Sequence, residues 1–165
     1  MNVAALNALP PDAARAALRR CCGSRRWADA MTARRPFVSA DDVLRAAAAV
    51  EAGLDRADWL EAFAAHPRIG DLDSLRKKFA ATADWAGAEQ AGVAGADEEI
   101  LQALAEGNRQ YEERFGHIFI VCATGKTATE MLTLLVERLN NEPEAELRVA
   151  AAEQAKITRL RLEKL

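Results

Sequence analysis

The segment His66-Pro67-Arg68-Ile69-Gly70-Asp71 separates two runs with helical patterns. Proline disfavours the helical region for the residue before it, so His66 is predicted at the C-terminal end of a helix covering about residues 55–65. Gly70 permits a sharp turn, and the Asp71 carboxylate can accept hydrogen bonds from the amides that open the next helix, about 72–79. Such a loop suits a general acid or base, although it also suits a plain helix corner whose imidazole caps carbonyl groups.

The composition outside this segment is typical of a helical protein. The chain has 165 residues, of which 50% are hydrophobic and only 5% aromatic, with nine glycines and five prolines. That length suits one domain with a core of its own, and the shortage of glycine and proline favours helices. We therefore predict an all-α fold in which residues 1–165 form a single compact multi-helix domain.

Charge and cysteine usage argue against several classes of function. The 22 basic and 25 acidic residues give a net charge of -3, without the basic block of a nucleic-acid-binding protein. Cys21, Cys22 and Cys122 form no C-x-x-C pair, and the two histidines complete no metal motif with them. Neither a membrane-length apolar run nor a secretory signal is visible, so we expect a cytoplasmic protein without a metal or a membrane partner.

Capping signals and apolar periodicity predict the remaining helices. They are expected at about residues 12–22, 24–35, 41–52, 97–114, 128–139 and 144–165. Thr127 and Glu130 form a capping box at the start of the helix 128–139. In the helix 97–114, Asn108 falls on an apolar stripe, so its amide is expected either to brace a buried network or to orient a catalytic group.

Residues 117–123 interrupt this helical pattern. They are mostly apolar and β-branched, and they follow Gly116. We predict a short extended buried segment rather than a sheet, because no second strand is available to pair with it. Its main-chain groups then need partners from side chains or from a ligand.

Two charged residues each allow a functional and a structural interpretation. Glu89 lies in a predicted helical turn, where small residues expose amides to a ligand and where a carboxylate also favours the helix dipole. Arg161 lies close to the helical line through Leu147, Gln154 and Thr158. Its side chain either points inward or stabilises a helix C-terminus in solvent.

Together, these motifs resemble the OHCU decarboxylase family. OHCU is 2-oxo-4-hydroxy-4-carboxy-5-ureidoimidazoline, an intermediate of urate degradation. The resemblance spans most of the chain in order and rests on residues 66–71, 89–92, Asn108 with Tyr111, 115–116, 119–123, 156–158 and 160–162. It implies a carboxy-lyase of the ureide pathway that converts OHCU to (S)-allantoin and carbon dioxide without a cofactor, usually as a homodimer.

The resemblance also implies roles for single residues. His66 corresponds to the catalytic acid or base, Glu89 to its acidic partner, and Arg161 to a clamp for substrate oxygens. The implied substrate-binding residues are Pro67, Ala86, Gly87, Ala88, Glu89, Gln90, Phe119, Ile120, Val121, Cys122, Ala123 and Arg161. Ala86 departs from the family, which often has serine there, so a hydroxyl contact is lost at that position.

Two other classes of function stay open on the sequence. A helical ligand-binding or interaction module would explain the capped helices, and a hydrolase of the same pathway would explain the polar loop. A binding module would leave freshly formed OHCU to its spontaneous decay. A ring hydrolase would release no carbon dioxide.

Overall fold

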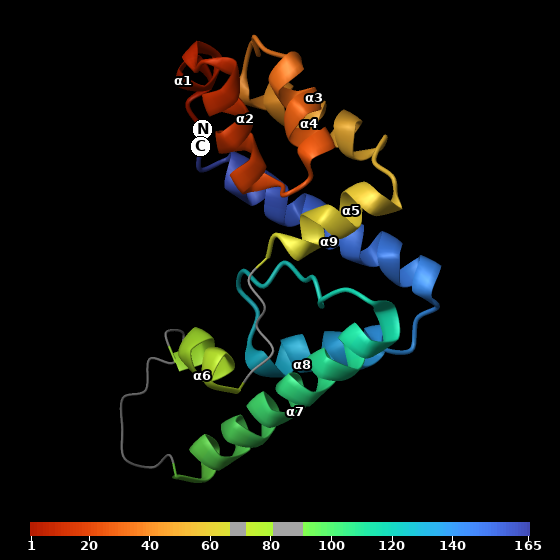
Figure 1. Cartoon of the computed structure of the whole chain (residues 1–165). Coiled ribbons are helices and arrows are strands. Elements are labelled where there is room, and N and C mark those ends of the chain that lie inside the picture. Colours follow the sequence, from red (N-terminus) through yellow and green to blue (C-terminus); the bar gives the residue numbers. More distant parts are fainter. Residues whose placement is uncertain (67–71, 81–90) are drawn as a thin grey trace. The chain divides into compact units, whose positions relative to one another are not determined.

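The computed structural model describes residues 1–66, 72–80 and 91–165, without the side chains of residues 78, 80 and 91–96. Within these ranges the regular elements are helices and no strand occurs, which confirms the predicted all-α fold. The helices, shown in Figure 1, are α1 (Val3–Ala8), α2 (Pro11–Cys21), α3 (Arg25–Ala33), α4 (Ala40–Glu51), α5 (Arg56–Ala64), α6 (Leu72–Ala80), α7 (Ala91–Phe115), α8 (Ala128–Arg138) and α9 (Pro143–Leu162).

Three helix starts differ from the sequence prediction. The short helix α1 was not expected, and the Asn2 side chain caps it by accepting a hydrogen bond from the amide of Ala5 at 2.9 Å. Helix α7 begins at Ala91, six residues before its predicted start, because extending an existing helix adds a hydrogen bond for each residue fixed. Helix α9 begins at Pro143, one residue before its predicted start, because proline suits the first helical position.

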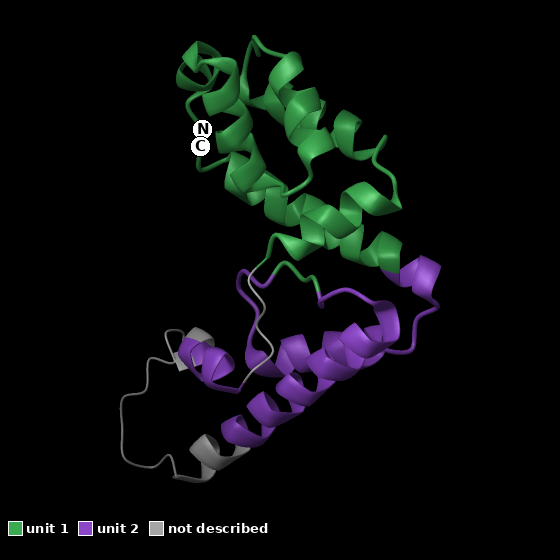
Figure 2. Ribbon diagram, in the orientation of Figure 1, with its two compact units in different colours: residues 1–66, 120–122, 147–165 green, residues 67–119, 123–146 purple. Residues whose placement is uncertain are grey.

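The chain divides into two compact units, and neither is continuous in sequence (Figure 2). Unit 1 contains residues 1–66, 120–122 and 147–165, and unit 2 contains residues 67–119 and 123–146. The chain passes from unit 1 to unit 2 at the end of α5, directly after His66. The assignment of residues 1–165 to a single domain stays a prediction.

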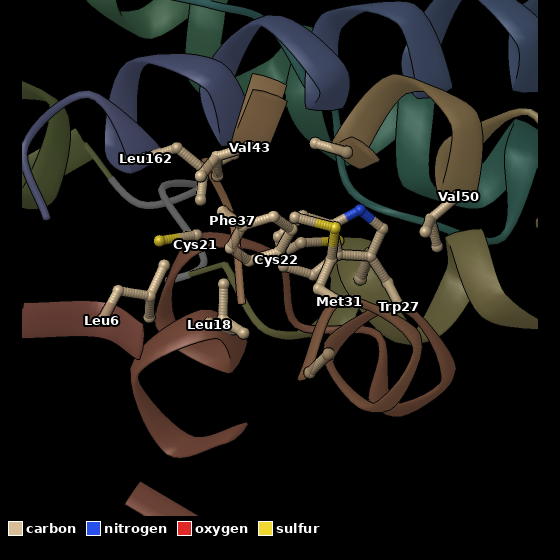
Figure 3. Close-up of a cluster of buried hydrophobic side chains, with 13 residues drawn as sticks. Leu6, Leu18, Cys21, Cys22, Trp27, Met31, Phe37, Val43, Val50 and Leu162 are labelled. Atoms are coloured by element: carbon tan, nitrogen blue, oxygen red, sulfur yellow. The ribbon is translucent and has the colours of Figure 1, made fainter. Parts of the chain in front are cut away.

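Unit 1 has an apolar core to which α2, α3, α4 and α9 contribute (Figure 3). Leu18, Trp27, Met31 and Val43 have no exposed surface, and Leu162 of α9 is equally buried in the same cluster. Burying apolar surface stabilises a fold by roughly 25 cal/mol for each Å² removed from water. The core therefore fixes the C-terminal part of α9 within unit 1.

Unit 2 is built around the packing of α7 against α8. A Cβ atom at Gly107 would lie 2.6 Å from Cδ2 of Leu135, so the absence of a side chain permits this close approach. Leu104 and Tyr111 are buried on α7 as predicted, whereas Asn108 is only half-buried. The predicted capping box of α8 is present at Thr127 and Glu130.

The segment 117–123 forms neither helix nor strand, in agreement with its predicted break in the helical pattern. Its burial is uneven, because His117, Ile120 and Cys122 are buried and the other residues of the segment are half-buried. The segment contributes to both units, with residues 120–122 in unit 1. Across the part of the chain that the structure describes, none of the helices combines the length and the apolar character needed to cross a membrane.

Candidate active site

Helix α9 holds the candidate site of unit 1 together. Three of its polar side chains, Glu153, Gln154 and Arg161, each bond to a different segment of that unit. Their partners are the backbone of residue 122, the His66 ring and the end of α2. One helix thus sets the positions of three segments that are far apart in sequence.

His66 lies directly after α5, at the position that the following proline predicts. Its amide donates to the carbonyl of Phe63 at 3.1 Å, which continues the last turn of the helix. A Cβ atom at Gly23 would lie only 2.2 Å from Cβ of Ala65, so Gly23 lets the end of α5 pack closely. The His66 side chain is half-buried, and its Nε2 lies 2.5 Å from Oε1 of Gln154.

Gln154 belongs to a buried chain of polar side chains. Gln154 has no exposed surface and Thr158 is 1% exposed. The Gln154 amide nitrogen donates to Oγ1 of Thr158 at 3.2 Å. Thr158 lies near the buried Cys22 thiol, whose pKa burial raises to about 11. The chain of hydrogen bonds runs from the His66 ring through Gln154 to Thr158.

The surroundings of His66 favour the neutral form of its imidazole. Burial lowers the pKa of His66 below its ordinary value of 6.5, and the positive charge of Arg161 lowers it further, against the opposing hydrogen bond with Gln154. A neutral imidazole is the form that acts as a general base. His66 and Arg161, two of the three predicted catalytic residues, are therefore close enough to interact electrostatically.

Arg161 lies at the C-terminal end of α2. Its Nη1 donates to the carbonyl oxygens of Arg20 at 3.2 Å and Cys21 at 3.4 Å. A cation there is favourable because a helix C-terminus carries partial negative charge. The structure thus gives Arg161 a helix-capping role, although it is half-buried rather than in open solvent. Both hydrogen bonds use Nη1 of Arg161. The role of Arg161 as a substrate clamp stays a prediction.

The segment 119–123 has separate contacts within each of the two units. In unit 1, the Cys122 amide donates to Oε2 of Glu153 at 2.7 Å, so the main chain finds a side-chain partner of the kind the sequence required. Ile120 is 2% exposed and Val121 is half-buried. In unit 2, the Phe119 ring lies edge-on to Tyr111 at 5.2 Å between centroids, and the Arg138 guanidinium lies 4.6 Å from the Phe119 centroid.

Several predicted site residues lie outside the described residues. They are Pro67, Gly70, Asp71, Ala86, Gly87, Ala88, Glu89 and Gln90. Their roles stay predictions, and so does the half-buried Ala123 as a substrate contact. Among the residues that the structure describes, no three His, Cys, Asp or Glu side chains are grouped so that they could hold a metal ion.

Sequence reasoning missed the residues that orient His66 and the segment 119–123. These are Gln154, Thr158 and Glu153. A signal was present, because Gln154 and Thr158 lie on the same helical line as Leu147, which is buried. A glutamine on a buried stripe needs a polar partner, but nothing in the spacing identifies that partner as a histidine 88 residues earlier.

Comparisons with known proteins identify a family that this chain matches over most of its length. The model of the family described as OHCU decarboxylase matches residues 7–163. The uric acid degradation bifunctional protein TTL of Arabidopsis thaliana is 42% identical over 147 residues, which cover 88% of this chain and 45% of the plant protein.

A mammalian relative and a solved structure agree with that match. The 2-oxo-4-hydroxy-4-carboxy-5-ureidoimidazoline decarboxylase of Mus musculus is 31% identical over 135 residues, or 82% of this chain and 75% of the mouse protein. A crystal structure of OHCU decarboxylase in the presence of (S)-allantoin is 38% identical, with a TM-score of 0.70, and the match covers 88% of this chain and 94% of that one. By contrast, the chain spans less than half of the plant protein.

Proposed function

Because the chain belongs to the OHCU decarboxylase family, we propose that it decarboxylates OHCU to (S)-allantoin and carbon dioxide in urate degradation. The observation that carries the proposal is the family match over residues 7–163. The mouse relative is named for this decarboxylation, and the similar crystal structure was obtained with (S)-allantoin. The neutral His66 imidazole beside the Arg161 cation supports the same reaction.

The chemistry of OHCU explains why such a site needs no electron-accepting cofactor. One ring carbon bears both a hydroxyl and a carboxylate, and the ring contains a C=N bond. When the bond to the carboxylate breaks, its electron pair passes into that C=N bond, so the substrate is its own electron sink. The protein has to place the carboxylate in a poorly solvated position, move the hydroxyl proton and protonate one face of the intermediate.

The proposed roles of individual residues follow from these demands. His66 moves protons, with Glu89 as its acidic partner. Arg161 offers the planar edge formed by Nε and Nη2 to substrate oxygens, because its capping bonds to α2 use Nη1. The other substrate contacts are proposed for Pro67, residues 86–90 and residues 119–123.

Circular dichroism at wavelengths where allantoin absorbs tests the activity directly. OHCU is generated in the cuvette from urate, with and without this protein. We expect faster appearance of one allantoin enantiomer, together with release of carbon dioxide. Spontaneous decay at an unchanged rate would indicate a binding module, and loss of OHCU without carbon dioxide would indicate a hydrolase.

A second experiment tests the proposal that the reaction needs neither a metal nor an organic cofactor. The protein is dialysed against a chelator and assayed again. We expect full activity to be retained. Loss of activity that zinc or manganese restores would overturn this part of the proposal.

We also propose that the protein is a cytoplasmic homodimer, on the basis of the family resemblance. Light scattering coupled to size-exclusion chromatography tests the dimer, because it measures the mass of the particle independently of its shape. A mass of about twice 17.9 kDa is expected. A single-chain mass at assay concentrations would contradict the proposal.

A further inference from the structure

The chain of hydrogen bonds that ends at His66 has a defined direction. The Thr158 hydroxyl oxygen is an acceptor in this chain. The Gln154 amide nitrogen donates to that oxygen at 3.2 Å, which turns Oε1 toward the imidazole. An amide oxygen can only accept, so Nε2 of His66 must carry the hydrogen across the 2.5 Å contact.

Burial makes this direction costly to reverse. Gln154 and Thr158 are 0% and 1% exposed, so little water can replace a lost partner. A flipped amide would point its N–H groups at Nε2 and its oxygen at Thr158. Thr158 would then have to donate to Gln154, and Nε2 of His66 would have to accept. Buried polar groups that lose a partner destabilise the arrangement, so the observed direction is favoured.

We propose that Gln154 is a positioning residue that holds His66 in the tautomer with hydrogen on Nε2, which leaves Nδ1 as the nitrogen that exchanges protons with the substrate. The proposal rests on the proposed function for its catalytic part, but the tautomer itself does not depend on that function. In the reaction, Nδ1 takes the hydroxyl proton and becomes N–H. The imidazolium keeps its Nε2–H bond to Gln154.

A neutral acceptor has a specific consequence here. The Gln154 oxygen does not take up the Nε2 proton of the imidazolium. The proton that Nδ1 gained is therefore available for return to the substrate. Gln154 also adds no negative charge that would hold the imidazolium against release of that proton. Among the residues that the structure describes, Arg161 acts on this ring, and its positive charge favours proton release.

The first test is the tautomer itself, read from two-bond ¹H–¹⁵N correlation spectra of labelled protein. The chain has two histidines, and the spectrum of His66→Ala assigns the signals. We expect His66 to be protonated at Nε2 only, and to become a mixture of both tautomers in Gln154→Leu. A wild-type ring protonated at Nδ1, or an unchanged ring in Gln154→Leu, would overturn the proposal.

The second test is kinetic. Gln154→Leu is expected to lower kcat about tenfold or more, with a smaller change in KM, because general acid–base transfer depends on ring orientation. Gln110→Leu is the matched control, since Gln110 is exposed on α7 and also bonds a side chain. An equal loss in both variants, or a pure KM effect in Gln154→Leu, would contradict a positioning role.

Two further variants keep the proposal testable if Gln154→Leu does not fold. Gln154→Glu retains an acceptor and is expected to retain the Nε2–H tautomer, while its negative charge raises the pKa of His66. Thr158→Val removes the anchor of the amide and is expected to mix the tautomers. Thr133→Val is its control, because Thr133 is exposed on α8 and its hydroxyl bonds within that helix. A wild-type protein inactive on OHCU would refute the proposed function, whereas the spectra would still decide the role of Gln154.

Discussion

Each unit buries a polar network, but the two networks differ in charge. In unit 2, the Glu146 carboxylate accepts from Tyr111, from Nε of Arg138 at 2.7 Å and from Asn141 at 2.8 Å. Glu146 is fully buried and Arg138 is 7% exposed. In unit 1, the two buried members are the neutral side chains Gln154 and Thr158.

The difference supports a stabilising role for the network of unit 2 and, under the proposed function, a chemical role for the network of unit 1. In unit 2, both oxygens of the Glu146 carboxylate accept hydrogen bonds, from residues of α7, α8 and the turn before α9. The carboxylate therefore links those elements. The neutral chain of unit 1 ends at a half-buried imidazole with a lowered pKa. A half-buried imidazole with a lowered pKa suits the proton exchange that we propose for His66.

The largest effect is expected from breaking the charged network. Glu146→Leu leaves the Arg138 guanidinium buried without its carboxylate, which should lower the free energy of unfolding by about 3–5 kcal/mol. Urea unfolding followed by circular dichroism measures the change. The double variant Glu146→Leu with Arg138→Met removes both charges and should recover most of the loss. A loss in the single variant that the double variant does not reduce would contradict the buried ion pair as its cause.

The next largest effect is expected at the neutral network. His66→Ala should lower turnover of OHCU by on the order of a hundredfold or more, in line with general acid–base contributions. The melting temperature should change little, because His66 is half-buried and follows the end of α5. Steady-state kinetics and a thermal melt on the same sample measure both quantities. Near-normal turnover would return this histidine to a helix-capping role.

A smaller effect is expected from Arg161→Lys. Lysine keeps the charge near the C-terminus of α2 but loses the planar fork, so substrate binding or turnover should weaken by about tenfold if oxygens are held by two bonds. Stability should change within about half a kcal/mol. Arg159→Lys is the matched control, since Arg159 is exposed on the same helix and pairs with Glu163. If the two variants behave alike, Arg161 only caps α2.

The smallest predicted effect is a displaced pH dependence. Because the pKa of folded His66 lies below 6.5, the neutral base persists as the pH falls past 6.5, and kcat/KM should decline only at lower pH. The free energy of unfolding should also fall with pH in this range. As the pH falls from 6.5 through the pKa of folded His66, the unfolded chain binds this proton first, and proton binding favours the unfolded state. Reaction rates corrected for spontaneous decay of OHCU measure the pH dependence of kcat/KM. Thermal melts of the protein and of His66→Asn across the same pH range measure the effect on stability. An acid limb centred above pH 6.5 would contradict the lowered pKa.

Local signals made much of the fold predictable. Ser24, Ser39, Asp55 and Thr127 accept hydrogen bonds at the starts of their helices, and the cap at Thr127 was predicted by name. Such caps act within three residues of sequence, so they can be read without knowing the fold. The start of α7 was missed because the glycines at 92 and 95 are weak helix formers, and propensity is readily overridden once a helix has formed.

The sequence by itself determined the helices, the break at 117–123, the position of His66 at a helix end and the family resemblance. Each depends on residues near one another in the chain or on a motif that can be recognised without coordinates. The tertiary structure decided that α9 brings Gln154 to His66, Glu153 to the backbone of Cys122 and Arg161 to the end of α2. These contacts join positions 31 to 141 residues apart, and helical periodicity shows only that a side chain faces inward, not which partner it meets there.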